Sequence, residues 1–196
     1  MEELKFRKLK ADEIECRIGS ISKEGKGLSL LLYKDARCDM NILDETVGAL
    51  NWKREHGREN ANCVVSIWDK EKQQWVSKED VGTESFTEKE KGLASDSFKR
   101  ACVNWGIGRE LYTAPFIWIK DGDCEIKKYG DKFSCYDRFI VKKIHYAENG
   151  DIDGIAIVNE KNPMKVIFSV LPKNTPTADK FENAKRILNN QFGEAK

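Results

Sequence analysis

The chain has little of the chemistry on which most metal sites and acid–base active sites depend. It contains only two histidines, His56 and His145, in 196 residues. None of its six cysteines forms a Cys-x-x-Cys pair, and neither histidine lies near a pair of cysteines. Zinc sites need several such ligands at short spacings, so the sequence argues against a zinc site. Cys63 and Cys102 fall on apolar faces, and we expect them to be core thiols in a reducing compartment.

Long apolar runs are also absent. The first residues, MEELKFRKLKADE, contain no apolar stretch typical of a signal peptide. No apolar run in the sequence reaches the length of about 18 residues that spans a membrane. We therefore expect a cytoplasmic protein with no membrane partner. The formal net charge is only +1, so a nucleic-acid site would have to be a local groove rather than a basic surface over the whole protein.

Motifs for catalysis and for nucleotide binding are missing as well. The sequence has no Gly-x-Ser-x-Gly, no His-Glu-x-x-His and no kinase signature. Residues 19–27, GSISKEGKG, resemble a phosphate loop, but five residues instead of four separate the glycines. Gly27 also stands where Ser or Thr should bind the metal ion, so we reject a nucleotide site. The sequence therefore favours a binding protein without a cofactor over an enzyme.

One acidic segment leaves a catalytic alternative open. Asp121, Asp123 and Glu125 alternate with other residues, as carboxylates that bind a hard metal ion can do. A metal-dependent nuclease would use such a group. A polar turn explains the same three residues, because a calcium loop needs more oxygen ligands than these, and we expect no metal site.

The apolar pattern predicts an α+β fold. Alternating residues predict strands over 28–33, 62–68 and 133–146, and Asn149-Gly150 is typical of a hairpin turn. We expect an antiparallel sheet with a long amphipathic helix packed across it. A C-terminal β-meander and a terminal helix over residues 178–191 should follow.

The long helix is expected to begin at Thr87, which can form a capping box with Glu90. Its buried side is an apolar stripe at helical spacing, formed by Leu93, Ala94, Ser97, Phe98, Ala101, Cys102 and Trp105. The other side carries Lys89, Lys99 and Arg100, and Arg109 follows the glycines that end the helix. Cations on the exposed side of a helix whose other side is buried can bind a phosphate backbone. An ordinary solvent-exposed helix face has the same composition, so this pattern fits both interpretations.

A second basic segment lies beside an aromatic residue. Lys53, Arg54 and Arg58 follow Trp52. A groove for single-stranded nucleic acid needs cations for the phosphates and can use aromatic faces for the bases. We therefore include Lys53 and Arg54 among the candidate binding residues.

The run Asp80-Val-Gly82, followed by a polar loop and a helix with Ser97-Phe98-Lys99-Arg100-Ala101 and Asn104-Trp105-Gly106, resembles the annealing core of the Rad fifty-two family. That family includes eukaryotic strand-annealing recombination proteins and phage relatives such as Sak. Tyr33, Leu43-Asp-Glu45, Gly48 and Trp52 agree with the family in order and spacing, so the resemblance covers roughly residues 20–115. It divides the chain into an N-terminal arm or helix (1–19), an annealing core (20–120) and a C-terminal meander and helix (121–196), packed on the same domain.

The resemblance implies that Lys99 and Arg100 line a groove for a single strand. It also places Lys91, Tyr33 and Lys23 at groove positions. Val103 stands where eukaryotic members have a third basic residue, and Arg109 could compensate for it. The candidate nucleic-acid-binding residues are therefore Lys23, Tyr33, Lys53, Arg54, Lys89, Lys91, Lys99, Arg100 and Arg109.

The function implied is ATP-independent annealing of complementary DNA strands in homologous recombination or repair. The implied partners are single-stranded DNA, further copies of the chain in a ring, and a single-strand binding protein. Two alternatives stay open, a metal-dependent nuclease and a non-catalytic oligomeric scaffold.

Overall fold

The computed structural model describes residues 4–83 and 89–172, which divide into two compact units. The first unit holds the described residues up to Leu9 together with Lys34–Arg109. The second unit holds Lys10–Tyr33 together with the described residues from Glu110 on. The units therefore do not follow the boundaries expected after residues 19 and 120, because the chain enters the second unit twice.

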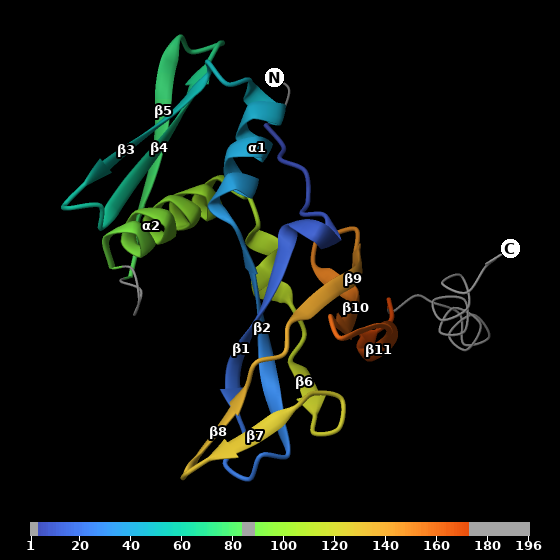
Figure 1. The fold of residues 1–196 in the computed structure, drawn as a ribbon. Coiled ribbons are helices and arrows are strands. Elements are labelled where there is room, and N and C mark those ends of the chain that lie inside the picture. The colour runs from blue at the N-terminus through green and yellow to red at the C-terminus, as the bar shows by residue number, and fades with distance from the viewer. Residues whose placement is uncertain (1–3, 84–88, 173–196) are drawn as a thin grey trace, which may run out of the picture. The chain divides into compact units, whose positions relative to one another are not determined.

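The first unit combines one sheet with two helices (Figure 1). Its elements are α1 (Ala36–Val47), β3 (Trp52–Gly57), β4 (Asn62–Asp69), β5 (Gln74–Val81) and α2 (Lys89–Trp105). The strands pair antiparallel in the order β3-β4-β5, and α2 packs on β4 and β5.

The apolar side of α2 forms the core of the first unit. Ser97, Phe98, Ala101 and Cys102 are fully buried, which confirms the centre of the stripe expected from the sequence. Cys63 of β4 is fully buried too, so both cysteines expected in the core lie there. The expected capping box lies outside the described residues.

The second unit is built mainly of strands (Figure 1). Its elements are η1 (Ala11–Glu13), β1 (Ile14–Ile21), β2 (Gly27–Lys34), η2 (Arg109–Thr113), β6 (Ile117–Lys120), β7 (Ile126–Tyr129), β8 (Lys132–Cys135), β9 (Phe139–Tyr146), β10 (Ile152–Asn159) and β11 (Asn162–Val170). The terminal residues Lys34 of β2 and Arg109 of η2 belong to the first unit. Six strands form one sheet in the order β11-β10-β9-β1-β2-β6, and β7 pairs only with β8. The edge strands of the six-stranded sheet, β6 and β11, contact each other, so this sheet is nearly closed and barrel-like. Leu28, Ile119 and Ile157 are fully buried in its core.

The predicted α+β class, with a long helix across one sheet, is wrong. The described residues are mostly β, with eleven strands in three sheets and only two α-helices. The helix α2 packs on β4 and β5 of the three-stranded sheet, which is half the size of the six-stranded sheet. The larger sheet forms because β9 of the C-terminal meander pairs with β1 near the N-terminus, so the meander is not an addition to a helical core.

The expected N-terminal arm or helix over residues 1–19 is also wrong in its second half. Residues 14–21 form β1, which pairs with β9 through Glu15 and Ile140. Ile14 is 5% exposed, so burial between sheet neighbours stabilises this segment as a strand.

The single strand expected over residues 133–146 is two strands, β8 and β9. The segment between them contains Asp137, which is 7% exposed. Its carboxylate accepts hydrogen bonds from the backbone N–H of Glu125 at 2.8 Å and from the side chain of Asn159 at 2.9 Å. These hydrogen bonds keep the segment between β8 and β9 from continuing as one strand. The terminal helix expected over residues 178–191 lies outside the described residues.

An ion pair is buried in the first unit. The Lys34 ammonium binds the Asp39 carboxylate, and the two side chains are 4% and 0% exposed. Gly108 leaves room for the Lys34 side chain, because a Cβ at this position would lie 2.3 Å from Cε of Lys34. Its φ of +70° also favours glycine. Burial raises the pKa of Asp39 to about 6, although the charge of Lys34 acts in the opposite direction. A charged Asp39 therefore depends on Lys34.

Candidate nucleic-acid interface

Three of the expected binding residues lie on β3 and α2 of the first unit, and one of them contacts Phe98. Arg54 of β3 places its guanidinium carbon 4.8 Å from the centroid of the Phe98 ring. Lys99 follows Phe98 directly, and Lys91 lies seven residues, or two helical turns, before it. Eight residues place Lys91 and Lys99 about 80° apart around α2 and about 12 Å apart along it. We call Arg54, Lys91, Phe98 and Lys99 the Phe98 cluster.

The position of Arg54 follows from the register of the sheet. Arg54 is opposite Val65, which is fully buried, so Arg54 points to the same face of the sheet as the core. As β3 is an edge strand, Arg54 stays exposed there and stacks on Phe98. Trp52, two residues earlier on the same face, stacks on Phe98 with 6.2 Å between ring centroids. The ring thus orients a cation whose donors remain open to solvent.

The structure separates Lys99 from Arg100. Arg100 points to the β5 side, where its Nε lies 3.4 Å from the Asp80 carboxylate. Lys99 lies on the α1 side: its charge helps to lower the pKa of Asp35, a smaller effect than the hydrogen bonds from Arg37. Adjacent residues of a helix point about 100° apart, so the two cations have different neighbours. Arg100 is 45% exposed, and Lys99 is half-buried.

Two further candidates have other contacts. The Arg109 guanidinium donates hydrogen bonds to the carbonyls of Val103 and Asn104, at 3.0 and 3.1 Å, and so caps the C-terminus of α2. Lys53 lies opposite Ser66, on the other face of the sheet from Arg54. Its ammonium lies 3.3 Å from Glu55 and 5.3 Å from the centre of the Trp75 ring. The structure does not bring either residue into the Phe98 cluster.

The remaining candidates divide between the units. Tyr33 of β2 and Lys23 of the turn between β1 and β2 belong to the second unit. Arg17 lies over the Tyr33 ring at 4.7 Å, and Lys23 is exposed. Lys89 is the first residue of α2, and the structure describes only its backbone.

Two of the three acids considered as a metal site, Asp123 and Glu125, bind lysines instead. Asp123 lies 2.6 Å from Lys165, and Glu125 lies 2.9 Å from Lys127 and 3.0 Å from Lys161. Within the part of the chain that the structure describes, no three His, Cys, Asp or Glu side chains form a group that could hold a metal ion. The geometry therefore gives the nuclease alternative no support.

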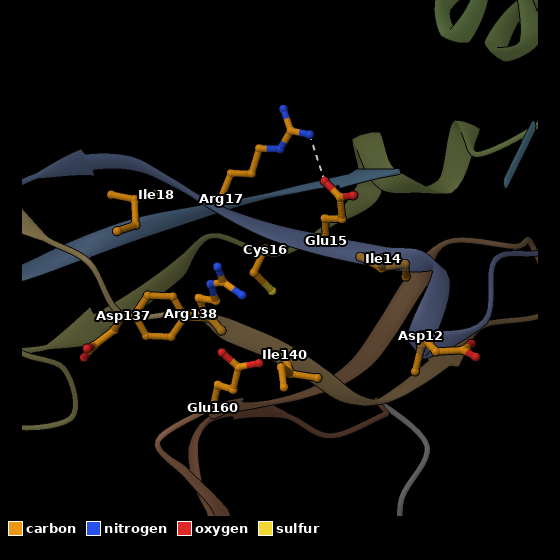
Figure 2. Close-up of a pocket in the computed structure, with 12 residues that line it drawn as sticks. Asp12, Ile14, Glu15, Cys16, Arg17, Ile18, Asp137, Arg138, Ile140 and Glu160 are labelled. Carbon is orange, nitrogen blue, oxygen red and sulfur yellow. Dashed lines mark hydrogen bonds and ion pairs between the residues drawn. The ribbon is translucent and has the colours of Figure 1, made fainter. Parts of the chain in front are cut away.

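A cleft of about 690 Å³ in the second unit was not expected from the sequence. It lies where β1 and β9 separate after their single register pair (Figure 2). Its charged lining residues are Asp12, Glu15, Arg17, Asp137, Arg138 and Glu160. The guanidinium of Arg17 turns away from the cleft to Glu15, at 2.8 Å (Figure 2). Four acids against two arginines make this cleft unsuitable for a polyanion.

No α-helix in the described ranges is long and apolar enough to span a membrane. In comparisons with family models, with curated proteins and with solved structures, nothing matches this chain.

Proposed function

We propose that this protein binds single-stranded DNA and anneals complementary strands without ATP, as a relative of the Rad fifty-two family acting in recombination or repair. The observation that supports it best is the Phe98 cluster. Arg54 stacks at 4.8 Å on a buried ring, and Lys99 is the next residue along the helix. Backbone contacts by such cations suit a sequence-neutral single-strand groove. Phe98 is fully buried, so it orients Arg54 and does not stack on a base.

The spacing of the cations fits a backbone rather than a single phosphate. Lys91 and Lys99 are eight residues apart, which is about 12 Å along a helix. Consecutive phosphates of a stacked strand are about 3.4 Å apart along its axis, so this distance covers three or four phosphates. Arg54 can supply a further, bidentate contact, because a guanidinium matches two phosphate oxygens.

The proposed mechanism requires no covalent step. The cations bind the phosphates of one strand and leave its base edges outward, where a complementary strand samples register and pairs. Backbone contacts alone carry no sequence information, so any strand can be loaded. Further copies of the chain, arranged in a ring, would extend the groove beyond the few phosphates that one protomer binds.

The salt dependence of binding tests this proposal. We expect the affinity for a labelled oligonucleotide of mixed sequence to fall between about 50 and 200 mM salt, because each bound phosphate releases counterions. For three phosphates per protomer the slope of log affinity against log salt should be about −2, at about −0.7 per phosphate. Fluorescence anisotropy measures it. Absence of binding at about 50 mM salt, or a slope near zero, would contradict the proposal and favour the scaffold alternative.

A further inference from the structure

The hairpin of β7 and β8 carries an exposed aromatic face in the second unit. Tyr129 pairs with Lys132, and Lys127 pairs with Ser134. Alternation along the strands therefore places Lys127, Tyr129, Lys132 and Ser134 on one face, and Tyr136, two residues after Ser134, continues it. We call these five residues the hairpin face.

The two tyrosines are more exposed than a large aromatic side chain normally is. Tyr129 is 53% exposed and Tyr136 is 78% exposed. Their ring centroids lie 6.5 Å apart with the planes at 77°, so each ring keeps a separate open face. A flat base can stack on either ring, although it cannot enter between them.

The opposite face of the hairpin packs against a neighbouring turn. Phe133 packs against the turn before β2, where a Cβ on Gly25 would lie 2.5 Å from the ring. The Lys128 ammonium lies 6.0 Å from the centroid of the same ring. Because the reverse face is anchored in this way, the tyrosines are held outward and lose little conformational freedom when they bind a ligand.

Both lysines of the hairpin face lie next to Tyr129 on that face. Lys132 is exposed opposite Tyr129. Lys127 lies 2.9 Å from Glu125, and both side chains are 53% exposed, so this ion pair exchanges readily with another anion. Cores of protein–protein interfaces are depleted in lysine, whereas single-strand grooves combine cations with stacking rings.

We propose that the hairpin face is a second contact for single-stranded nucleic acid, in which bases stack on Tyr129 and Tyr136 while Lys127 and Lys132 bind phosphates. This inference rests on the proposed function, because the ligand class is the same. It gives a binding role to a part of the chain that lies outside the resemblance to the Rad fifty-two family.

Replacing both tyrosines by alanine tests the inference. We expect Tyr129→Ala with Tyr136→Ala to raise the Kd for a mixed-sequence oligonucleotide by about 10-fold or more at about 200 mM salt, because stacking remains when electrostatic binding is weak. Tyr129→Phe with Tyr136→Phe keeps the rings and should stay within about 2-fold of the unchanged protein. Phe116→Ala removes another exposed ring, 76% exposed and outside the hairpin, and should have equally little effect. Thermal unfolding confirms that each variant folds.

The outcomes separate this inference from the proposed function. Unchanged affinity of the alanine variant, while the unchanged protein binds, would overturn the hairpin contact and leave the Phe98 cluster in place. A variant that binds DNA normally but loses self-association in light scattering would show a protein interface, which also overturns it. Failure of the unchanged protein to bind any strand would overturn both. Ultraviolet crosslinks from a bound oligonucleotide to Tyr129 or Tyr136, located by mass spectrometry, would support the inference directly.

Discussion

Replacing Lys34 by methionine is expected to lower the free energy of unfolding by about 3–5 kcal/mol at pH 8, since it leaves the carboxylate of Asp39 charged and buried without its partner. Both side chains are almost completely inaccessible to water, so no solvent can replace the ammonium. Urea denaturation measures the loss. Lys34→Met combined with Asp39→Leu is the control, and it should cost much less, because neither charge then remains to be buried.

The loss in free energy of unfolding caused by Lys34→Met should depend on pH. Burial raises the pKa of Asp39 to about 6 in the folded protein, above its ordinary value of 3.8. The folded state therefore holds this proton more tightly than the unfolded state, and the resulting stability falls as pH rises from about 4 to 6. At pH 5 the carboxyl of the Lys34→Met variant is neutral, so the substitution should cost less than at pH 8. An equal cost at both pH values, or a cost below about 1 kcal/mol at pH 8, would contradict this view of the pair.

Neutralising two cations of the Phe98 cluster is expected to have the largest effect on DNA binding. Arg54→Gln with Lys99→Gln should raise the Kd for a mixed-sequence oligonucleotide by about 100-fold at about 50 mM salt, or about 10-fold for each lost phosphate contact. The slope of log affinity against log salt should become shallower by about 1.4, because two phosphates are no longer neutralised. Anisotropy titrations at several salt concentrations measure both quantities.

Arg100→Gln is the matched control for this experiment. It removes the same charge from the adjacent residue of α2, but Arg100 points to Asp80 on the β5 side. We expect its Kd to stay within about 3-fold of the unchanged protein, because loss of an exposed ion pair has little effect. If Arg100→Gln weakens binding as much as the double variant does, the groove lies on the other side of α2 and the Phe98 cluster is not the site.

Local patterns predicted the parts of the fold that depend on near neighbours. The buried stripe around Phe98 follows from helical spacing alone, and the strand over residues 62–68 follows from alternation. The strand β1 could not be recognised in this way, because its partner Ile140 lies 125 positions after Glu15 (140 minus 15). Without that partner, residues 14–21 have only the mixed charged and apolar pattern that also suits a helix.

In the candidate site, too, the sequence does not reveal contacts that depend on the three-dimensional fold. Lys99 and Arg100 are adjacent in the sequence, which suggested one pair of cations, but a helix turns them toward different neighbours. The contact of Arg54 with Phe98 joins residues 44 positions apart (98 minus 54) and depends on sheet register, which the sequence alone does not determine. The alternation over residues 133–146 predicts one strand that includes Tyr136, whereas Tyr136 follows β8 and lies beside Tyr129.

The most direct test of the proposed function is annealing itself. Two complementary oligonucleotides, one with a fluorophore and one with a quencher, are mixed with the full chain in the absence of ATP and of metal ions. The account predicts that the protein accelerates quenching well above the spontaneous rate, and that Arg54→Gln with Lys99→Gln removes most of the acceleration while Arg100→Gln keeps it. A rate equal to the spontaneous rate, from protein shown to be folded and to bind single strands, would contradict it.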